Sequence, residues 1–288
     1  MKLQYKKLEK NTLSSIYAKR IFQPYLGSHW HFHKEYELMY ILKGQGMKII
    51  GDHISNFSSG ELVLVGGWLP HLWRNETGTA GSNEVDFIVI KFLKELHGVN
   101  IFSLPEFAQI RNLLERAHLG IQFCEEAQRG IREAIVNLSE SQSSDKIIEF
   151  LRILDALSKE NQYKLLCSPG YSLPIQVQGE NRLQKVINYI FDNYAQNITL
   201  EDISEIAIMT PTAFCRFFKT RTNKTFSYFL NEVRISKACQ LLLNQENSIK
   251  QICYNVGFNS LTSFNRTFRN FKGKTPSAYR AYYKVLHR

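Results

Sequence analysis

The stretch that decides the fold lies near the C-terminus and reads IKQICYNVGFNSLTSFNRTFRNFKGKTPSAYR, residues 249–280. A stretch 50 residues earlier repeats its pattern, and the shift superposes these pairs: Phe214 on Phe264, Arg216 on Arg266, Phe218 on Phe268, and Lys224-Thr225 on Lys274-Thr275. An internal repeat of this length indicates one supersecondary unit that is built twice.

Each copy has the pattern of two short helices joined by a turn. Apolar residues at helical spacing open the copy, and the turn follows at residues 208–210 in the first copy and 257–260 in the second. A helix N-cap is expected after each turn, at Thr210 in the first copy and at Asn259 or Ser260 in the second. This arrangement is typical of a helix-turn-helix, whose second helix enters the major groove of DNA.

The segment between the copies, Phe226 to Leu243, predicts one continuous helix of about 27 Å. A rigid helix of that length can hold two DNA-reading helices about one turn of the duplex apart, roughly 34 Å. We therefore expect residues 181–288 to form an all-α domain with two helix-turn-helix units.

The positive charge of the chain lies in the same segment. The formal net charge is +10, and the residues after Glu180 hold 16 Lys and Arg against 6 Asp and Glu, while those up to Glu180 hold 20 of each kind. Charge that is confined to one folded segment favours binding to the phosphates of a nucleic acid. Double-stranded DNA is the expected partner.

The quoted stretch, from Ile249 through Gly257 and Phe264 to the run Gly273-Lys-Thr-Pro276, resembles the signature of the AraC/XylS family of transcriptional regulators. The resemblance covers roughly the last 105 residues. The first unit departs from the family pattern at its turn, where Ile208 replaces the usual glycine. A left-handed glycine is worth about 1 kcal/mol there, so we expect an altered turn and not a lost one.

The resemblance implies which side chains face DNA. The base-facing positions are Thr212, Cys215 and Arg216 in the first unit and Leu261, Thr262, Ser263 and Arg266 in the second. For each arginine, a phosphate contact or a salt bridge within the domain is the alternative. Phosphate contacts, which position a protein without specifying sequence, are expected from Lys219, Arg221, Lys237, Lys272 and Lys274.

The N-terminal part alternates apolar and polar residues at 37–42, 47–50 and 61–65 and is punctuated by glycines, which predicts short antiparallel strands. Residues 1–104 are therefore expected to form a small β-barrel. At 105–167 the apolar period becomes helical, which predicts a helical subdomain that packs under the barrel or forms a dimer seam. Turn formers at 168–180 predict a linker.

The stretch from His31 to Glu37, followed by Gly44, and the stretch from Gly60 to His71, followed by Asn75, resemble the two motifs of cupins. Gly66 and Trp68 stand where the second motif normally has Pro and Gly. Side chains two apart on a strand share a face, so the following residues are expected to form one group with ligand atoms for a divalent first-row metal: His31, His33, Glu37 and His71. The favoured alternative is that these residues are vestigial or contact an organic ligand by hydrogen bonds, as in many sensory cupins attached to DNA-binding domains. Trp68 and Trp73 are candidate effector contacts, and a sugar is one candidate ligand. The alternative is that these tryptophans belong to the core of the barrel.

Together these patterns predict an α+β protein: a cupin-like barrel with helices, followed by the two helix-turn-helix units. We expect a cytoplasmic transcriptional regulator without catalytic activity or an obligatory cofactor, which forms a homodimer, senses a small molecule and has RNA polymerase as a candidate partner. The five cysteines, an odd number without a C-x-x-C pair, fit reduced thiols. The alternative is a metal-dependent cupin enzyme or metal sensor fused to a DNA-binding domain.

Overall fold

The computed structural model describes residues 15–26, 30–75, 84–96, 98–171, 180–243 and 247–286. The chain divides into two compact units, largely the residues up to Leu173 and those from Pro174 onward. No helix within these ranges has both the length and the apolar character that crossing a membrane requires.

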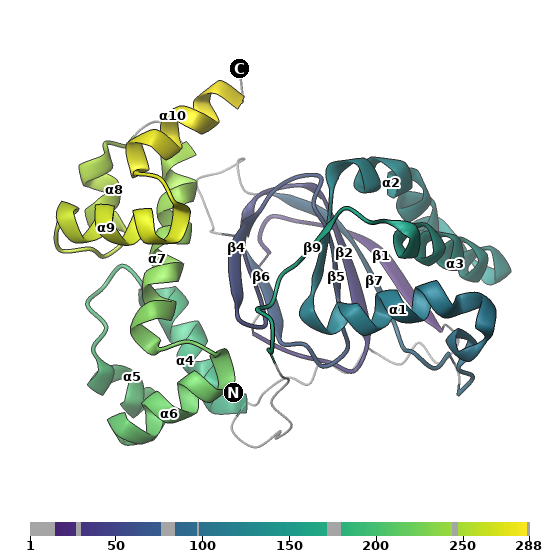
Figure 1. The fold of residues 1–288 in the computed structure, drawn as a ribbon, viewed down its shortest axis with the longest axis horizontal. Helices are drawn as coiled ribbons and strands as arrows, with labels where there is room; N and C mark the ends of the chain where they lie inside the picture. Colours follow the sequence, from purple (N-terminus) through teal and green to yellow (C-terminus); the bar gives the residue numbers. More distant parts are fainter. Residues whose placement is uncertain are drawn as a thin grey trace. The chain divides into compact units, whose positions relative to one another are not determined.

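The N-terminal unit contains two sheets (Figure 1). The six-stranded sheet has the order β1-β7-β2-β5-β8-β9, and the three-stranded sheet has the order β4-β3-β6. The strands are β1 (Ile16–Gln23), β2 (Tyr36–Lys43), β3 (Gly46–Ile50), β4 (His53–Phe57), β5 (Leu62–Val65), β6 (His71–Arg74), β7 (Val85–Phe92), β8 (Ile121–Phe123) and β9 (Tyr163–Leu165). The strands expected at 37–42, 47–50 and 61–65 are thus confirmed as β2, β3 and β5.

The central strands of the larger sheet, β2, β5 and β7, are buried on both faces. Leu38 and Tyr40 of β2 pack in a core with α1 (Ala108–Arg116), α2 (Glu125–Glu140) and α3 (Ser143–Lys159). Met39 and Ile41, which alternate with them, pack on the other face in a core that includes Ile50, Phe57 and Trp73 of the smaller sheet. Three short 3-10 helices, Ile101–Ser103, Pro105–Phe107 and Ala117–Leu119, lie in the chain around α1.

The strands do not close into the expected small barrel. Where the structure describes it, the larger sheet has two ends, β1 and β9, and helices cover one of its faces (Figure 1). The segment 105–167 is also not purely helical, because β8 pairs with β5 and β9 pairs with β8. Each of these strands has only three residues, which is too short to change the apolar period of the sequence. The prediction from periodicity therefore did not include them.

The expected linker begins inside the N-terminal unit. The backbone N–H of Ser168 donates to Asp52 Oδ1 at 3.0 Å, and its hydroxyl group bonds to the other carboxylate oxygen. Tyr171 is buried in the same core as Trp73. Residues 172–179 of the expected linker lie outside the described residues.

The C-terminal unit is helical in all its described elements (Figure 1). They are α4 (Glu180–Asn193), α5 (Leu200–Ile206), α6 (Pro211–Thr222), α7 (Phe226–Leu243), α8 (Ile249–Asn255), α9 (Leu261–Lys272) and α10 (Pro276–Leu286). The continuous helix expected from Phe226 to Leu243 is α7. The first half of α7 packs on the first helix-turn-helix, where the ring centroids of Phe218 and Phe229 lie 5.4 Å apart. Its second half supplies Ile235 and Cys239 to the core of the second helix-turn-helix.

Helix starts follow the expected side chains. The hydroxyl group of Thr210 accepts the N–H of Ala213 at the start of α6, with Pro211 in the first turn, and the hydroxyl group of Ser260 accepts the N–H of Ser263 at the start of α9. Each preceding helix also starts with a capping box, at Thr199 for α5 and at Ser248 for α8. Such caps are worth about 1 kcal/mol each. They fix where the second helix of each unit begins.

Candidate nucleic-acid interface and histidine cluster

The second helix of each unit is anchored by two phenylalanines one turn apart. Phe214 and Phe218 of α6 are fully buried, and so are Phe264 and Phe268 of α9. Because i and i+4 share one face of a helix, the opposite face of α6 and α9 is left to solvent. This exposed face is the candidate DNA-reading surface of each unit.

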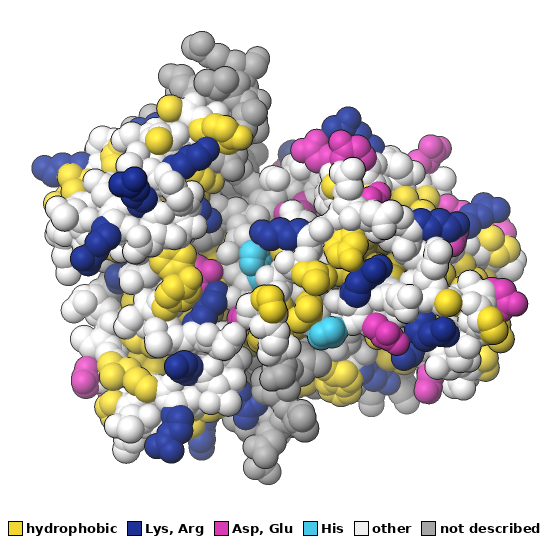
Figure 2. Space-filling view, in the orientation of Figure 1, with side chains coloured by type: hydrophobic (Ala, Val, Ile, Leu, Met, Phe, Trp, Pro, Cys, Tyr) yellow, Lys and Arg dark blue, Asp and Glu magenta, His cyan; other side chains and the backbone are white. Residues whose placement is uncertain are grey.

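The expected base-facing residues lie on or beside that surface. Thr212, Cys215, Arg216 and Lys219 of α6 are exposed, as are Thr262 and Arg266 of α9, while Leu261 and Ser263 are partly exposed. Lys and Arg side chains are spread over the surface of the C-terminal helices (Figure 2). The helices therefore offer exposed polar and cationic groups at equivalent places in both units.

The two arginines are not held by acidic partners. Neither the Arg216 nor the Arg266 side chain forms an ion pair with any residue in the described part of the chain. The alternative of a salt bridge within the domain thus has no partner among those residues. Both guanidinium groups are available to hydrogen-bond acceptors outside the protein, which are base edges or phosphates.

The turn of the first helix-turn-helix has the same backbone conformation as the turn of the second. Ile208 has φ +55° and Gly257 has φ +87°. The N–H of Ile208 donates to Glu205 at 2.8 Å, as the N–H of Gly257 donates to Tyr254 at 3.0 Å. The prediction that the first turn is altered but not lost is confirmed. One residue separates Ile208 from the N-cap Thr210, whereas two residues separate Gly257 from the N-cap Ser260. Ile208 adopts the left-handed conformation that usually requires glycine.

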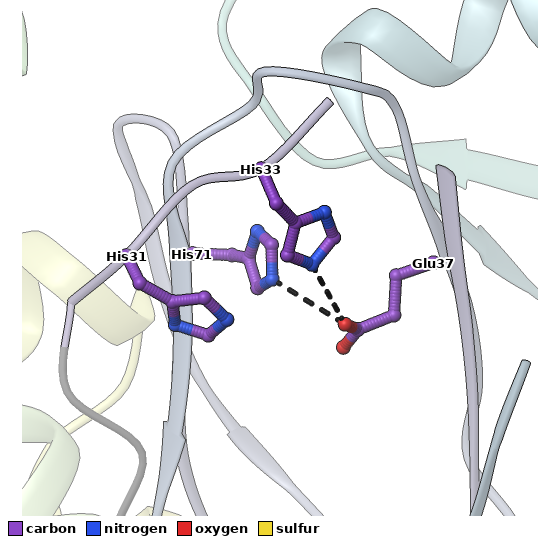
Figure 3. Close-up of side chains that lie close together, drawn as sticks. All are labelled: His31, His33, Glu37 and His71. Atoms are coloured by element: carbon purple, nitrogen blue, oxygen red, sulfur yellow. Dashed lines mark hydrogen bonds and ion pairs between the residues drawn. The ribbon is translucent and has the colours of Figure 1, made fainter. Parts of the chain in front are cut away.

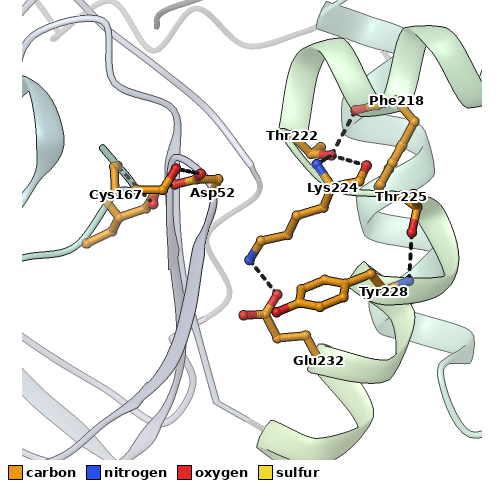
Figure 4. Close-up of polar contacts among 10 residues, drawn as sticks. Asp52, Cys167, Phe218, Thr222, Lys224, Thr225, Tyr228 and Glu232 are labelled. Atoms are coloured by element: carbon orange, nitrogen blue, oxygen red, sulfur yellow. Dashed lines mark hydrogen bonds and ion pairs between the residues drawn. The ribbon is translucent and has the colours of Figure 1, made fainter. Parts of the chain in front are cut away.

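The connection that leaves each second helix is also repeated. Asn223 ends α6 in the left-handed conformation, as Gly273 ends α9. Lys224, which follows, forms an ion pair of 2.5 Å with Glu232 of α7 (Figure 4). The equivalent Lys274 instead places its ammonium 3.7 Å from the ring centroid of Tyr282.

These contacts qualify some of the expected phosphate contacts. The Lys237 ammonium bonds to Gln240 at 3.3 Å and lies 5.9 Å from the ring centroid of Tyr194, all within the C-terminal unit. Lys237 points into its own domain because it lies on the face of α7 that packs, a fact that spacing alone did not reveal. Lys219 and Lys274 remain exposed.

The N-terminal unit brings the four expected metal-ligand residues together. The potential ligand atoms of His31, His33, Glu37 and His71 all lie within 4.8 Å of one another. The rings of His33 and His71 point toward the carboxylate of Glu37, with Nε2 to Oε2 distances of 3.0 and 3.7 Å (Figure 3). These three residues are buried. Only Glu37 lies on a strand of the larger sheet; His31 precedes β2 and is held by a backbone bridge to His71.

Backbone carbonyls fix the orientation of two rings. Nδ1 of His33 lies 3.0 Å from the carbonyl oxygen of Glu35, and Nδ1 of His71 lies 2.7 Å from that of Leu69. A carbonyl oxygen can only accept a hydrogen bond, so both Nδ1 atoms carry a proton and donate. Burial, partly offset by Glu37, lowers the pKa of His71 and favours its neutral ring. Its Nε2 lone pair therefore faces the cluster and has no hydrogen-bond donor among the described residues.

The sequence did not single out Lys91, which completes this cluster. Its ammonium lies 2.7 Å from Glu37 Oε2 and 3.1 Å from His33 Nε2. Burial by itself would raise the pKa of Glu37, but the charge of Lys91 and smaller contributions from the two rings outweigh it, and the pKa lies well below its ordinary value. A single lysine within the apolar run VDFIVIKF was the available signal.

The donor set fits a divalent metal in kind and orientation. Imidazole and carboxylate ligands suit first-row metals, and a ligating histidine usually donates its other N–H to a carbonyl or carboxylate, as His33 and His71 do. Ligand atoms bound to one such ion are at most about 4.2 Å apart. Small side-chain shifts would therefore bring His31, His33, Glu37 and His71 within reach of one ion.

The two candidate effector tryptophans have different surroundings. Trp73 is buried, and its ring centroid lies 5.5 Å from that of His71 at the edge of the cluster. Trp68 is 48% exposed, has φ +66°, and donates its backbone N–H to the carbonyl of His33 at 2.6 Å. A bulky residue in the left-handed region is strained. The loop that holds Trp68 is thus tied directly to the cluster.

Known proteins are similar to this chain mainly in its C-terminal, helical unit. Residues 203–282 match the family model described as a helix-turn-helix domain. The transcriptional activator RhrA of Rhizobium meliloti is 40% identical over 103 residues, 35% of this chain and 32% of RhrA. The Msm operon regulatory protein of Streptococcus mutans is 22% identical over 255 residues, 85% of this chain and 84% of that protein.

Among solved structures, the DNA-binding domain of AdpA in complex with a target DNA aligns with 36% of this chain and 95% of that chain, at 26% identity and a TM-score of 0.36. The chain spans about a third of the length of curated relatives such as RhrA, which it matches over the helical unit. The C-terminal part of this chain is therefore a helix-turn-helix DNA-binding domain of the AraC type, homologous to those of transcriptional regulators.

Proposed function

We propose that the chain is a sequence-specific transcriptional regulator of the cytoplasm that reads its operator with α6 and α9 and has no catalytic activity. The observation that carries the proposal is the repeat itself: Arg216 and Arg266 each project from the exposed face of a helix whose opposite face is anchored by two buried phenylalanines. Base-edge contacts by arginine, to guanine above all, are the commonest specific contacts in the major groove.

Selection of binding sites from random duplex DNA with the full chain tests this proposal. An enriched operator with steep loss of affinity between low and physiological salt is expected, because the net charge of +10 resides after Glu180. Recovery of no common sequence would indicate a non-specific DNA-binding protein and contradict the proposal.

We further propose that the regulator acts as a homodimer and that RNA polymerase is a protein partner.

The N-terminal unit is proposed to sense a small molecule at the histidine cluster. Glu37 and His71 Nε2 offer hydrogen-bond acceptors there, the Lys91 ammonium is a donor, and the ring of Trp73 borders the group. Mixed donors and acceptors beside an aromatic ring suit a hydroxylated ligand such as a sugar. His31, His33 and Trp68 complete the proposed effector residues.

Tryptophan fluorescence tests this site, because all three tryptophans of the chain, Trp30, Trp68 and Trp73, lie in the N-terminal unit. A sugar that changes operator affinity should also change the emission of the full chain, and Glu37→Gln should weaken both effects together. A ligand that changes operator affinity without altering emission or protecting amides of this unit from hydrogen exchange would place the effector site elsewhere.

A metal sensor is the second candidate, favoured by the four convergent ligand residues. Metal analysis of the purified full chain is its test. Near-stoichiometric Fe, Mn, Ni or Zn that is lost when His31 and His33 are both replaced by Ala would support it.

A further inference from the structure

Lys91 faces Glu37 across two neighbouring strands. The two residues are direct partners in the register of β7 and β2, so their side chains leave the sheet on the same face. The Lys91 ammonium contacts Glu37 Oε2 at 2.7 Å and His33 Nε2 at 3.1 Å. We propose that Lys91 is the internal cation of the histidine cluster, which competes with a divalent metal for the same ligand atoms.

The competition follows from the lone pairs. Nδ1 of His33 donates to the Glu35 carbonyl, which leaves Nε2 as the ring atom that faces the cluster. To coordinate a metal, Nε2 must offer its single lone pair. That lone pair can accept an N–H of Lys91 or coordinate a metal, but not both. An ion about 2.1 Å from His33 Nε2 and Glu37 Oε2 would also lie against the ammonium, and two cations at that separation repel strongly.

Lys91 is placed so that it can leave. Its side chain is 13% exposed, whereas that of Lys48 is 1% exposed and lies 2.6 Å from Glu61. A lysine has a flexible four-carbon stem and a well-hydrated head. The ammonium can therefore withdraw toward solvent when a stronger ligand for Glu37 enters, and the cluster then gains a metal at the expense of one internal ion pair.

As a consequence, Lys91 lowers the affinity of the cluster for a metal. When a site is competent for only one-tenth of the time, its apparent affinity falls about tenfold. Lys91 occupies the cluster in the structure, so its removal should raise the metal affinity. This proposal concerns the ligand atoms of the N-terminal unit and does not depend on the DNA-binding function.

Cobalt(II) binding to the tag-free full chain tests the proposal, with visible absorption and calorimetry as readouts. Lys91→Met should bind one equivalent at least about tenfold more tightly than the unaltered chain, and the gain should vanish in the Lys91→Met, His71→Ala double variant. Lys91→Arg, which keeps the charge, should show no gain. Lys43→Met is the matched control, because Lys43 at the end of β2 forms an exposed ion pair with Glu84, which directly precedes β7. A folded Lys91→Met chain with unchanged or weaker cobalt affinity overturns the proposal.

A second measurement uses the unaltered chain and does not need the variant to fold. Acetylation of lysines, followed by peptide mass spectrometry, reports the accessibility of Lys91 with and without millimolar cobalt(II). Labelling of Lys91 should rise when cobalt is present, while that of Lys48 stays unchanged. Lys91 labelling that does not respond to cobalt means that metal and ammonium do not exchange at the cluster, and it overturns the proposal as well.

Discussion

The turns of the two helix-turn-helix units have the same backbone conformation but different residues at the key position. Both turns have a residue with positive φ that donates to a carbonyl three positions back, but the residue is Ile208 in the first unit and Gly257 in the second. A Cβ atom on Gly257 would lie 2.7 Å from the carbonyl oxygen of Tyr194, whereas the Ile208 side chain is 74% exposed. The surroundings, and not the turn itself, decide where glycine is required.

The largest expected effect comes from Gly257→Ala. The new Cβ would overlap backbone atoms of Tyr194 and Ala195, which cannot move as a side-chain end can, and φ +87° is strained for alanine. We expect a loss of about 2 kcal/mol or more in the free energy of unfolding, measured by urea denaturation of the full chain. Gly273→Ala is the matched control, since it has φ +69° and open space around its Cβ. Equal losses for both variants would mean that conformation alone, without the overlap, accounts for the effect.

The next effect concerns DNA. Arg216→Ala and Arg266→Ala should each weaken binding to the selected operator by about 1–3 kcal/mol, because each removes a side chain that can reach a base edge. Fluorescence anisotropy with operator and scrambled duplexes measures both affinity and specificity. If affinity for the two duplexes falls equally, the arginines are phosphate clamps, and sequence must be read by Thr212, Thr262 and Ser263 or through DNA shape.

Replacing Ile208 by glycine should stabilise the first unit. The substitution relieves a β-branched residue of a left-handed backbone, which is worth about 1 kcal/mol, and loses little burial because the side chain is exposed. The midpoint of urea unfolding of the C-terminal unit should rise. An unchanged or lower midpoint would show that the Ile208 side chain has a stabilising contact which offsets the strain.

The smallest effect separates positioning from reading. Lys219 and Arg269 are equivalent exposed cations near the ends of α6 and α9. Lys219→Ala and Arg269→Ala should weaken all duplexes alike and reduce the slope of log affinity against log salt by about one unit each. A change in sequence preference with an unaltered salt slope would assign a base contact to the position instead.

Local signals in the sequence were sufficient for the helical unit. The N-caps Thr210 and Ser260 and the bounds of α7 follow from short-range patterns, because capping and helical periodicity act within a few residues. The four residues of the cluster were also identified, from the resemblance to cupin motifs and their spacing, although His31 and His33 reach it from a segment before β2 and not from a strand.

Long-range pairing accounts for what the sequence did not reveal. The open six-stranded sheet depends on β8 and β9, whose three residues each pair with distant strands. Lys91 joins the cluster only through its register with Glu37, 54 positions earlier in the chain. A pattern within one segment has no information on which strand will lie beside it.

Two similar helix-turn-helix units, joined by one rigid helix, are proposed to read two segments of the same face of DNA. A base-by-base substitution scan of the selected operator, with the full chain and with Arg216→Ala and Arg266→Ala, tests it most directly. We predict that the two variants lose preference at different base pairs, about 10 bp apart, and that each leaves the preference of the other segment intact. Loss of preference at the same base pairs in both variants, or at base pairs with no fixed separation, would contradict the account.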